Sequence, residues 1–424
     1  MLNNLNKLTQ DLSVNFPNSS LLQDIQLIKE VNTMQHIKIN LKENLEEMVN
    51  KYQKLKSPSI TCGILTYNEE RCIKRCLNSI INEFDEIIII DSLSTDNTVE
   101  IIKQHFPNTK LIFENWINDF SFHRNKIINL ASTDWIYFID ADNTYDIKNK
   151  GKAKRIAKLL DFLKIKCVVS PIITEHNGHI YTDTRRLFSL KNNLLFTGKV
   201  HEEPIFIDKT IPNNITVNIY VHHDGYNPKI VNQMTKNTRN IELTKQMINI
   251  EPKNPKWLFF YARELERENK DSTLIKNVLL SGIELYNSIP DKHYYLDTML
   301  LLCKILFQTN DFKKLNELIK LLEQNFPNCS DITYYKTALI FLDIQLKTKK
   351  LINYLQINFD NPEKNKYSLI NSTNDHIKYT MLKLHFFLGE WDQSIDIYRN
   401  LKSKEIQKEF LEYANNLKEK LNEI

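Results

Sequence analysis

Between residues 60 and 224, short apolar runs alternate with segments of helical periodicity, and this alternation constrains the fold more than any other feature of the chain. Apolar runs that alternate with helices are typical of a mostly parallel sheet covered by helices. Four runs are predicted to be strands: ITCGIL, EIIIID, KLIFE and WIYFID. Polar residues follow three of them, at 66–68, 91–96 and 140–142. Ligands of open α/β sheets bind at the carboxyl ends of the strands, so the sequence predicts a site there.

The regions on either side of this segment are predicted to be helical. In residues 1–56, Leu22, Ile25, Ile28 and Val31 follow helical spacing, and the region ends in the basic linker KLKSPS. Beyond residue 228, nearly all of the chain is predicted to form helices of about 12–17 residues joined by short polar turns. We therefore predict an N-terminal helical segment (1–56), an α/β domain (57–235) and an all-α domain (236–424).

Similar patterns recur in the predicted all-α domain. Asp311-Phe312 and Glu390-Trp391 each begin a helix with an apolar or small residue three positions after the aromatic one. Trp257 begins a further unit of this kind. The pattern resembles tetratricopeptide-type helix pairs, which bury their faces by stacking. A plain helical bundle is the alternative.

Composition excludes several classes of protein and of site. Lys and Arg number 56 against 52 Asp and Glu, and a net charge of +4 gives no reason to expect a nucleic acid or an anionic membrane as the main partner. The seven glycines form no GxG, so any nucleotide is held without a glycine-rich loop. The six cysteines form no CxxC and are predicted to be structural thiols. We see neither a signal peptide nor an apolar run long enough to span a membrane, and expect a cytoplasmic protein.

The pair Asp140 and Asp142 ends a strongly apolar strand. Residues i and i+2 of an extended chain point to the same side, so the two carboxylates are expected to face one hard cation, Mg²⁺ or Mn²⁺. Such an ion offsets the charge that develops on a departing diphosphate. An aspartate pair of this kind also occurs by chance, and its position at a strand end is what favours a metal site.

Two arginines and one further aspartate are candidates for contacts with a bound nucleotide. Arg124 lies on the apolar stripe of a predicted helix, and a buried guanidinium needs a partner. That partner is a protein carboxylate, such as Asp119 or Asp140, or a donor phosphate or base. Of the neighbours Arg185 and Arg186, one is expected to face the site. Asp91 could accept hydrogen bonds from a base or ribose, or the loop that it begins could simply cap a helix.

Three residues in two later polar turns are candidates for chemistry. His201 and Glu202, in GKVHEEP, would suit an acid–base role. His223, in YVHHDGY, could be a third ligand of the metal or the diphosphate. A lone histidine is more often structural, and the repeated arrangement of an apolar run followed by a polar turn favours a site role here.

Taken together, these motifs resemble those of family 2 glycosyltransferases of GT-A fold. The matching segments are TYNEE, DSLSTDNT, WINDFSFHRN, WIYFIDADN, TRRLF, GKVHEEP and HDGYNP. Over nearly its whole length, including NPKWLFF, the chain also resembles the sublancin-type peptide S-glycosyltransferases of glycocin biosynthesis. The resemblance implies inverting transfer of a hexose, typically glucose, from a UDP-sugar to a cysteine of a ribosomal precursor peptide. It also implies that the helical region binds the peptide or forms a homodimer.

The resemblance implies roles for single residues as well. It assigns Tyr67, Asn68 and Glu69 to the nucleotide-binding first loop, Asp91 to the uridine contact and Arg124 to the donor pocket. It assigns the metal to Asp140 and Asp142, and it does not identify the base. The predicted donor-binding set is completed by Thr66, Ser92, Asp140, Ala141 and Arg186.

Other functions remain open at the level of sequence. A serine hydroxyl, or a cell-surface glycan or lipid, could be the acceptor. The chain could also be an inactive helical-repeat adaptor, or a nucleotidyltransferase, which would release pyrophosphate instead of UDP. The sequence does not separate UDP-glucose from other UDP-hexoses.

Overall fold

The structure is a computed structural model, and it describes residues 2–30, 44–223, 233–290, 292–361, 363 and 367–423. The chain divides into two compact units, Met1–Ile289 and Pro290–Ile424.

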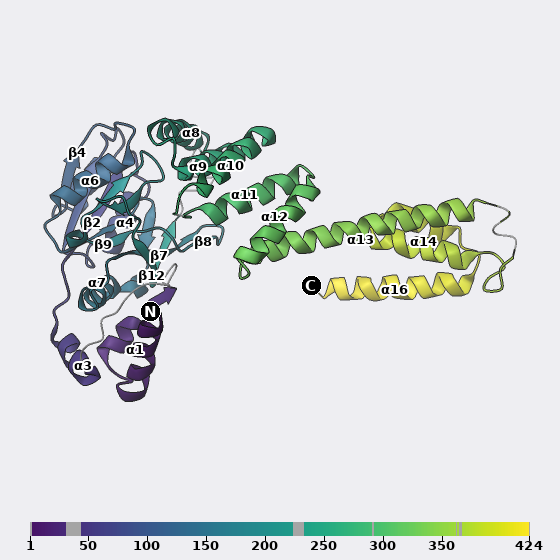
Figure 1. Ribbon diagram of the computed structural model, residues 1–424, viewed down its shortest axis with the longest axis horizontal. Helices are drawn as coiled ribbons and strands as arrows, with labels where there is room; N and C mark the ends of the chain where they lie inside the picture. Colours follow the sequence, from purple (N-terminus) through teal and green to yellow (C-terminus); the bar gives the residue numbers. More distant parts are fainter. Residues whose placement is uncertain are drawn as a thin grey trace. The chain divides into compact units, whose positions relative to one another are not determined.

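The first unit is built on a mixed sheet (Figure 1). Its main strands follow the order β1-β12-β7-β9-β5-β2-β3-β4, while β6 pairs with β12 and β8 pairs with β7. The pairs β5/β2, β2/β3, β3/β4 and β12/β7 are parallel, whereas β9 is antiparallel to both of its neighbours. The strand bounds are Ile28–Glu30 (β1), Ile60–Thr66 (β2), Glu86–Asp91 (β3), Lys110–Phe113 (β4), Trp135–Phe138 (β5), Asn143–Tyr145 (β6), Cys167–Glu175 (β7), Ile180–Tyr181 (β8), Leu187–Ser189 (β9) and Asn213–His223 (β12). A separate hairpin joins β10 (Leu194–Thr197) to β11 (Glu203–Phe206).

Helices connect the strands and extend the unit beyond the sheet. Their bounds are Leu2–Asn15 (α1), Ser20–Ile25 (α2), Leu45–Lys54 (α3), Ile73–Ile80 (α4), Thr98–His105 (α5), Phe120–Leu130 (α6), Lys152–Phe162 (α7), Gln233–Ile250 (α8), Pro255–Arg267 (α9) and Ser272–Asn287 (α10). The helix α9 begins with Asn254 as a side-chain cap and a proline in its first turn, both favourable at a helix start.

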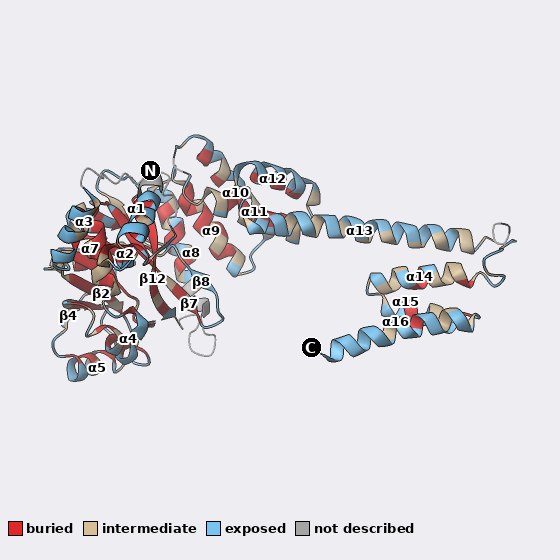
Figure 2. Ribbon diagram, turned by 90° about the horizontal axis from the view of Figure 1, so that it is seen from below, coloured by how far each residue is buried: buried red, intermediate tan, exposed pale blue. Residues whose placement is uncertain are grey.

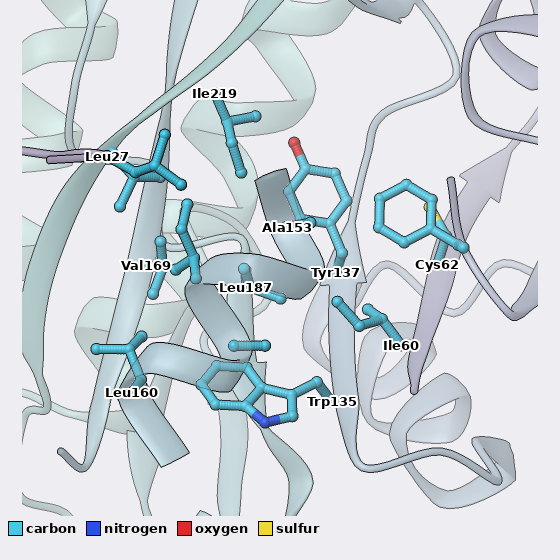
Figure 3. Packing of buried hydrophobic residues seen from close by; sticks show 14 of the residues in the cluster. Leu27, Ile60, Cys62, Trp135, Tyr137, Ala153, Leu160, Val169, Leu187 and Ile219 are labelled. Atoms are coloured by element: carbon cyan, nitrogen blue, oxygen red, sulfur yellow. The ribbon is translucent and has the colours of Figure 1, made fainter. Parts of the chain in front are cut away.

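The core of this unit fills the space between the sheet and its helices. Figure 3 shows Trp135 and Tyr137 of β5 close to Ile60 and Cys62 of β2, all of them buried. Leu160 of α7 belongs to the same cluster. Alternate residues of β5 therefore anchor the strand firmly, and this fixes where the chain emerges toward Asp140.

The N-terminal region differs from its purely helical prediction. Ile28 lies in β1, which pairs antiparallel with β12, instead of continuing the helical pattern of Leu22 and Ile25. A three-residue strand is too short for its periodicity to be recognised. Val31, the next residue of that pattern, lies outside the described residues. Part of this region therefore belongs to the sheet.

The second unit is all-helical. Its helices are Tyr295–Gln308 (α11), Phe312–Asn325 (α12), Ser330–Phe359 (α13), Asp375–Phe387 (α14), Trp391–Arg399 (α15) and Lys404–Asn422 (α16). Figure 2 shows that α13 and α16 have largely exposed or half-buried surfaces. At 30 residues α13 is about twice the predicted helix length, because no glycine or proline interrupts it. No helix in the described part of the chain is long and apolar enough to cross a membrane.

The predicted fold class, an α/β domain followed by helices, is confirmed. The strands predicted at ITCGIL, EIIIID, KLIFE and WIYFID correspond to β2, β3, β4 and β5. The tetratricopeptide-type pairing of the later helices stays a prediction, as do the domain boundaries at 56 and 235.

Candidate active site

The carboxyl ends of β2, β3 and β5 meet at one edge of the sheet. Thr66 and Asp91 are direct partners in the parallel β2/β3 register, and Ser92 N donates a hydrogen bond to Thr66 O at 2.9 Å. Thr66 Oγ1 is buried and has no hydrogen-bond partner among the described residues. The β5 strand ends two residues before Asp140, on the other side of β2.

The loop after β3 is held by its own hydrogen bonds. The buried Asp91 accepts from Ser94 N at 2.8 Å and from Ser94 Oγ at 2.6 Å. Ser94 Oγ in turn accepts from Asn68 N, and Asn68 Oδ1 accepts from Thr95 N, both at 2.8 Å. The loops after β2 and β3 thus form one hydrogen-bonded surface in which the backbone of Asn68 is left-handed, with φ 55°.

The start of the next helix, α5, is held by this loop. Asn97 occupies the N-cap position without a side-chain cap hydrogen bond, and Asp96 Oδ1 accepts from Thr98 N and Thr98 Oγ1 in the first turn.

Asp140 lies between two guanidinium groups. Its Oδ1 accepts from Arg124 Nη2 at 3.0 Å, and its Oδ2 accepts from Arg186 Nη2 at 2.5 Å. Burial alone would raise the pKa of Asp140, but attraction by Arg186 and Arg124 outweighs it and holds the pKa well below the usual range. Asp140 is therefore a carboxylate at any physiological pH.

Arg124 is the centre of this arrangement. It is buried on α6, whose N-cap Asp119 accepts from Phe122 N. Arg124 Nε donates to Glu202 Oε1 at 2.7 Å, and the guanidinium lies over the rings of Phe138 and Phe196 at 5.1 and 5.3 Å. Burial opposes its charge, but Glu202 and Asp140 more than compensate and raise the pKa of Arg124. Of the partners left open by the sequence, the structure shows protein carboxylates: Asp140 and, in place of Asp119, Glu202.

Asp142 faces a different partner. The chain turns after β5, because Asn143 N donates to Asp140 O at 2.9 Å, so the alternation of an extended chain does not apply at this point. The two carboxylates have different partners in the structure, and their sharing of one cation stays a prediction. Asp140 engages the two arginines, whereas Asp142 Oδ2 lies 3.1 Å from His223 Nε2.

His223 is held from both sides by carboxylates. Its Nδ1 lies 2.8 Å from Glu175 Oε1, and Glu175 and His223 are register partners in β7 and β12. Burial disfavours the charged ring, but hydrogen bonds and attraction from Asp142 and Glu175 raise the pKa of His223 to about 9. Asp142 Oδ1 and Glu175 Oε2 are buried without a hydrogen-bond partner in the described part of the chain.

These donors are of the right kind for a divalent cation, although they are not arranged as a complete site. Carboxylates suit Mg²⁺ and Mn²⁺, and imidazole is a common metal ligand. Within residues 44–223 and the other described ranges, no group of three His, Cys, Asp or Glu side chains is placed to hold a metal ion.

The remaining candidates lie around this centre. A pocket of about 320 Å³ adjoins His223 and is lined by Arg75, Thr144, Thr174, Glu175, His176, His222 and His223. Tyr67 is 56% exposed on the loop after β2. The Glu69 carboxylate accepts from Cys72 Sγ at 2.9 Å, and Ala141 is buried in the turn after β5.

His201 packs against α9. Its ring stacks on Phe260 of α9, with centroids 4.1 Å apart, and its Nε2 lies 3.3 Å from Glu264 Oε1. Arg185, the neighbour of Arg186, pairs with Asp183 at 2.9 Å. Of the two arginines, Arg186 is thus the one at the site.

Comparison with known proteins shows the family of this chain. Residues 61–222 match the model for Glycosyl transferase family 2. The glycosyltransferase SunS of Bacillus subtilis strain 168 is 42% identical over 406 residues, which cover 96% of this chain and 95% of that protein. The chain belongs to the family 2 glycosyltransferases.

Two further proteins are similar to this glycosyltransferase. SunS of Bacillus phage SPbeta matches with the same identity and coverage. A structure of residues 1–349 of S. aureus TarS in complex with UDP-GlcNAc covers 84% of this chain and 92% of that chain, with 14% identity and a TM-score of 0.34. The predicted membership of the chain in this family is confirmed by the match to SunS.

Within this glycosyltransferase, the structure also brings in residues that the sequence did not single out. Glu175 binds His223, and Arg75 Nη2 donates to Asp142 O at 3.3 Å. Glu175 ends an apolar strand, as Asp91 does, and that position was the available signal.

Proposed function

We propose that this glycosyltransferase transfers a hexose, glucose, with inversion from a UDP-sugar to a cysteine thiol of a ribosomally made bacteriocin precursor peptide. The observation that carries the proposal is the Arg124–Asp140–Arg186 cluster beside Asp142 and His223, at the carboxyl edge of the sheet. The similarity to SunS over nearly the whole chain supports it.

The donor diphosphate would lie against the two arginines. Arg124 Nη1 and Arg186 Nε are buried donors without a hydrogen-bond partner among the described residues. Guanidinium groups in a buried site stabilise a departing diphosphate, and such preorganised charge is usually the largest contribution to catalysis. Thr66, Tyr67, Asn68, Glu69, Asp91, Ser92 and Ala141 would form the nucleoside side of the pocket.

A divalent cation, Mg²⁺ or Mn²⁺, would be held by Asp142 and His223. Asp140, also predicted as a ligand, would use a carboxylate oxygen that already accepts from Arg124 or Arg186. When bound, the ion offsets charge on the diphosphate. His223 and Asp142 already lie within 3.1 Å of each other, so the two ligands are adjacent.

In the reaction, the acceptor sulfur forms a bond to the anomeric carbon while the bond from that carbon to the UDP oxygen breaks. The thiol proton leaves to solvent or to Glu202. A thiol with a reference pKa of about 8.5 is already a few per cent thiolate at neutral pH and needs little help from a base. We assign assistance of a less acidic hydroxyl acceptor to Glu202, and its pairing with Arg124 beside the proposed diphosphate site supports this assignment.

A test compares cysteine and serine acceptors. The protein, UDP-glucose and Mg²⁺ are incubated with a cysteine-containing precursor peptide and with its Cys→Ser form, and mass spectrometry measures addition of a hexose. We expect modification of the cysteine form, and replacement of Glu202 by Gln should slow serine transfer much more than cysteine transfer. Transfer to saccharide acceptors with no peptide modification would contradict the proposal. Equal losses of transfer rate on the cysteine and serine peptides in Glu202→Gln would contradict the role of Glu202.

We also infer a homodimer in a reducing, cytoplasmic compartment. The six cysteines are free, and five of them are buried, which agrees with such a compartment. The all-helical unit is the proposed site of peptide binding or dimerisation.

A further inference from the structure

We propose that α9 positions the active-site loop 198–203, and that Glu264 and His201 form the latch between the two. The function of this latch, holding Glu202 against Arg124, rests on the glycosyltransferase site proposed above. His201 thereby becomes a positioning residue and not a group that touches the reacting atoms.

The loop has a backbone that needs support. His201 is left-handed, with φ 51°, and Gly198 has φ 104°. A non-glycine residue in this region costs free energy and persists only where its surroundings hold it. At Gly198 an added Cβ would lie 2.5 Å from Trp257 of α9, so the loop and the helix are in direct contact.

The ring of His201 provides that support. It is nearly parallel to Phe260, with an interplanar angle of 13°. Arg263 Nη2 lies 3.3 Å from Nδ1, and because a guanidinium only donates, Nδ1 must be the acceptor. The ring proton is then on Nε2, which lies 3.3 Å from Glu264 Oε1 as a close electrostatic contact that lacks the geometry of a hydrogen bond. Both ring nitrogens of His201 are thus directed at α9.

Glu264 is a fully buried carboxylate. It pairs with Arg263 at 3.0 Å and with Arg267 at 3.2 Å, in addition to its contact with His201. Charges of this kind are costly to bury and are weak sources of stability, but they can fix one arrangement over others. In this loop, the buried charges around Glu264 fix the position of the His201 ring.

The latch acts on the site through one peptide unit. Glu202 follows His201 directly, and its carboxylate points the other way, to Arg124 at 2.7 Å. A second tie lies on the far side of Glu202, where Lys256 of α9 donates to Glu203 at 2.7 Å. The loop is therefore bound to α9 on both sides of Glu202, its residue that pairs with Arg124.

The test uses three variants of the full chain. Glu264→Ala removes the latch, Glu264→Gln keeps a side-chain oxygen opposite His201 Nε2, and Ala262→Gly weakens the same helix at a buried position outside the contacts named above. We expect amide hydrogen exchange in residues 198–203 to become at least tenfold faster in Glu264→Ala, with most of the protection restored in Glu264→Gln. We also expect kcat for donor hydrolysis to fall at least tenfold in Glu264→Ala, with a smaller change in KM for the donor.

The control variant shows whether a loss of activity comes from loss of loop positioning or from a general loss of stability. Ala262→Gly should lower the melting temperature while leaving kcat and exchange in the loop close to the wild type. Equal losses of kcat in Ala262→Gly and Glu264→Ala at equal melting temperature would overturn the proposal, as would unchanged exchange in Glu264→Ala. A wild type that cleaves no UDP-sugar would contradict the proposed function instead, and hydrogen exchange, which needs no donor, would still test the latch.

Discussion

Arg124 combines three roles that no other side chain could supply in the same space. It is buried, it links Asp140 to Glu202, and it lies over two aromatic rings. A planar guanidinium can donate to two carboxylates in different directions, whereas an ammonium is a point charge.

Arg124→Lys should therefore be a severe change. We expect kcat for hexose transfer to fall about 100- to 1000-fold, the loss typical of removing one transition-state donor, because one of the two carboxylates loses its partner. Steady-state kinetics with a UDP-sugar checks this. Lys191→Arg, a basic exchange at an exposed position outside the Asp140 cluster and the loop 198–203, serves as the control. A loss under threefold in Arg124→Lys would contradict the assignment.

The buried His201 is expected to make the stability of the fold depend on pH. Burial lowers the pKa of His201 to about 4, below its ordinary 6.5, despite the nearby Glu264. The unfolded chain therefore binds a proton at His201 before the folded chain does, and stability falls as pH drops from about 6.5 to about 4. Full loss would be on the order of 3 kcal/mol.

Urea unfolding, followed by tryptophan fluorescence at pH 7 and pH 4.5, measures this difference. The control is His201→Asn, since asparagine tolerates the left-handed backbone and does not titrate. The wild type should lose more stability than the variant between the two pH values. Identical losses would show that His201 is not held in its neutral form.

Several site residues could be predicted singly from the sequence, but their partners could not. Arg124, Asp140 and Asp142 stand out because polar groups interrupt apolar patterns. The contact of Asp142 with His223 spans 81 positions, and it depends on how β12 pairs with β7. The pairing of Glu175 with His223 could not be predicted for the same reason, because local periodicity does not determine the register between parallel strands.

At the scale of elements, the loop 198–203 is defined by its contact with α9. Gly198 and Gly151 both have positive φ, at 104° and 70°, but only Gly198 lies against another side chain. Comparing variants at the two glycines therefore separates the cost of backbone strain from the cost of steric contact.

Gly198→Ala should be clearly more destabilising than Gly151→Ala. Both variants incur a backbone cost of about 1 kcal/mol, and Gly198→Ala adds a clash with Trp257 of roughly 1–3 kcal/mol. Melting temperatures of the two variants measure the difference. Equal shifts would mean that α9 does not press on this loop.

The strands and their order along the chain were easier to predict than the pairing between them. Continuous apolar runs located β2, β3 and β5, because strands buried on both faces need such runs. The edge strand β4 is only half-buried to exposed, and its short apolar run still located it. The β1 strand escaped prediction because three residues carry no period, and the turn at Asp140 escaped it because the run WIYFID continues its apolar pattern past the end of β5.

At the scale of the whole molecule, the compact units divide near residue 289. The predicted boundary at 235 would separate α9 from the loop that it contacts. A chain ending at residue 289 should therefore fold and retain hydrolysis of a UDP-sugar, whereas a chain ending at residue 235 should lose both. Circular dichroism and UDP release compare the two. Retained hydrolysis in the shorter chain would refute the dependence of the site on α9.

A crystal structure of the full chain with UDP and Mn²⁺ would test the proposed donor site without relying on any variant. We predict that the diphosphate lies against Arg124 and Arg186, and that the ion is bound by Asp142 and His223. A diphosphate bound elsewhere, with these four side chains contacting neither UDP nor the ion, would contradict the account.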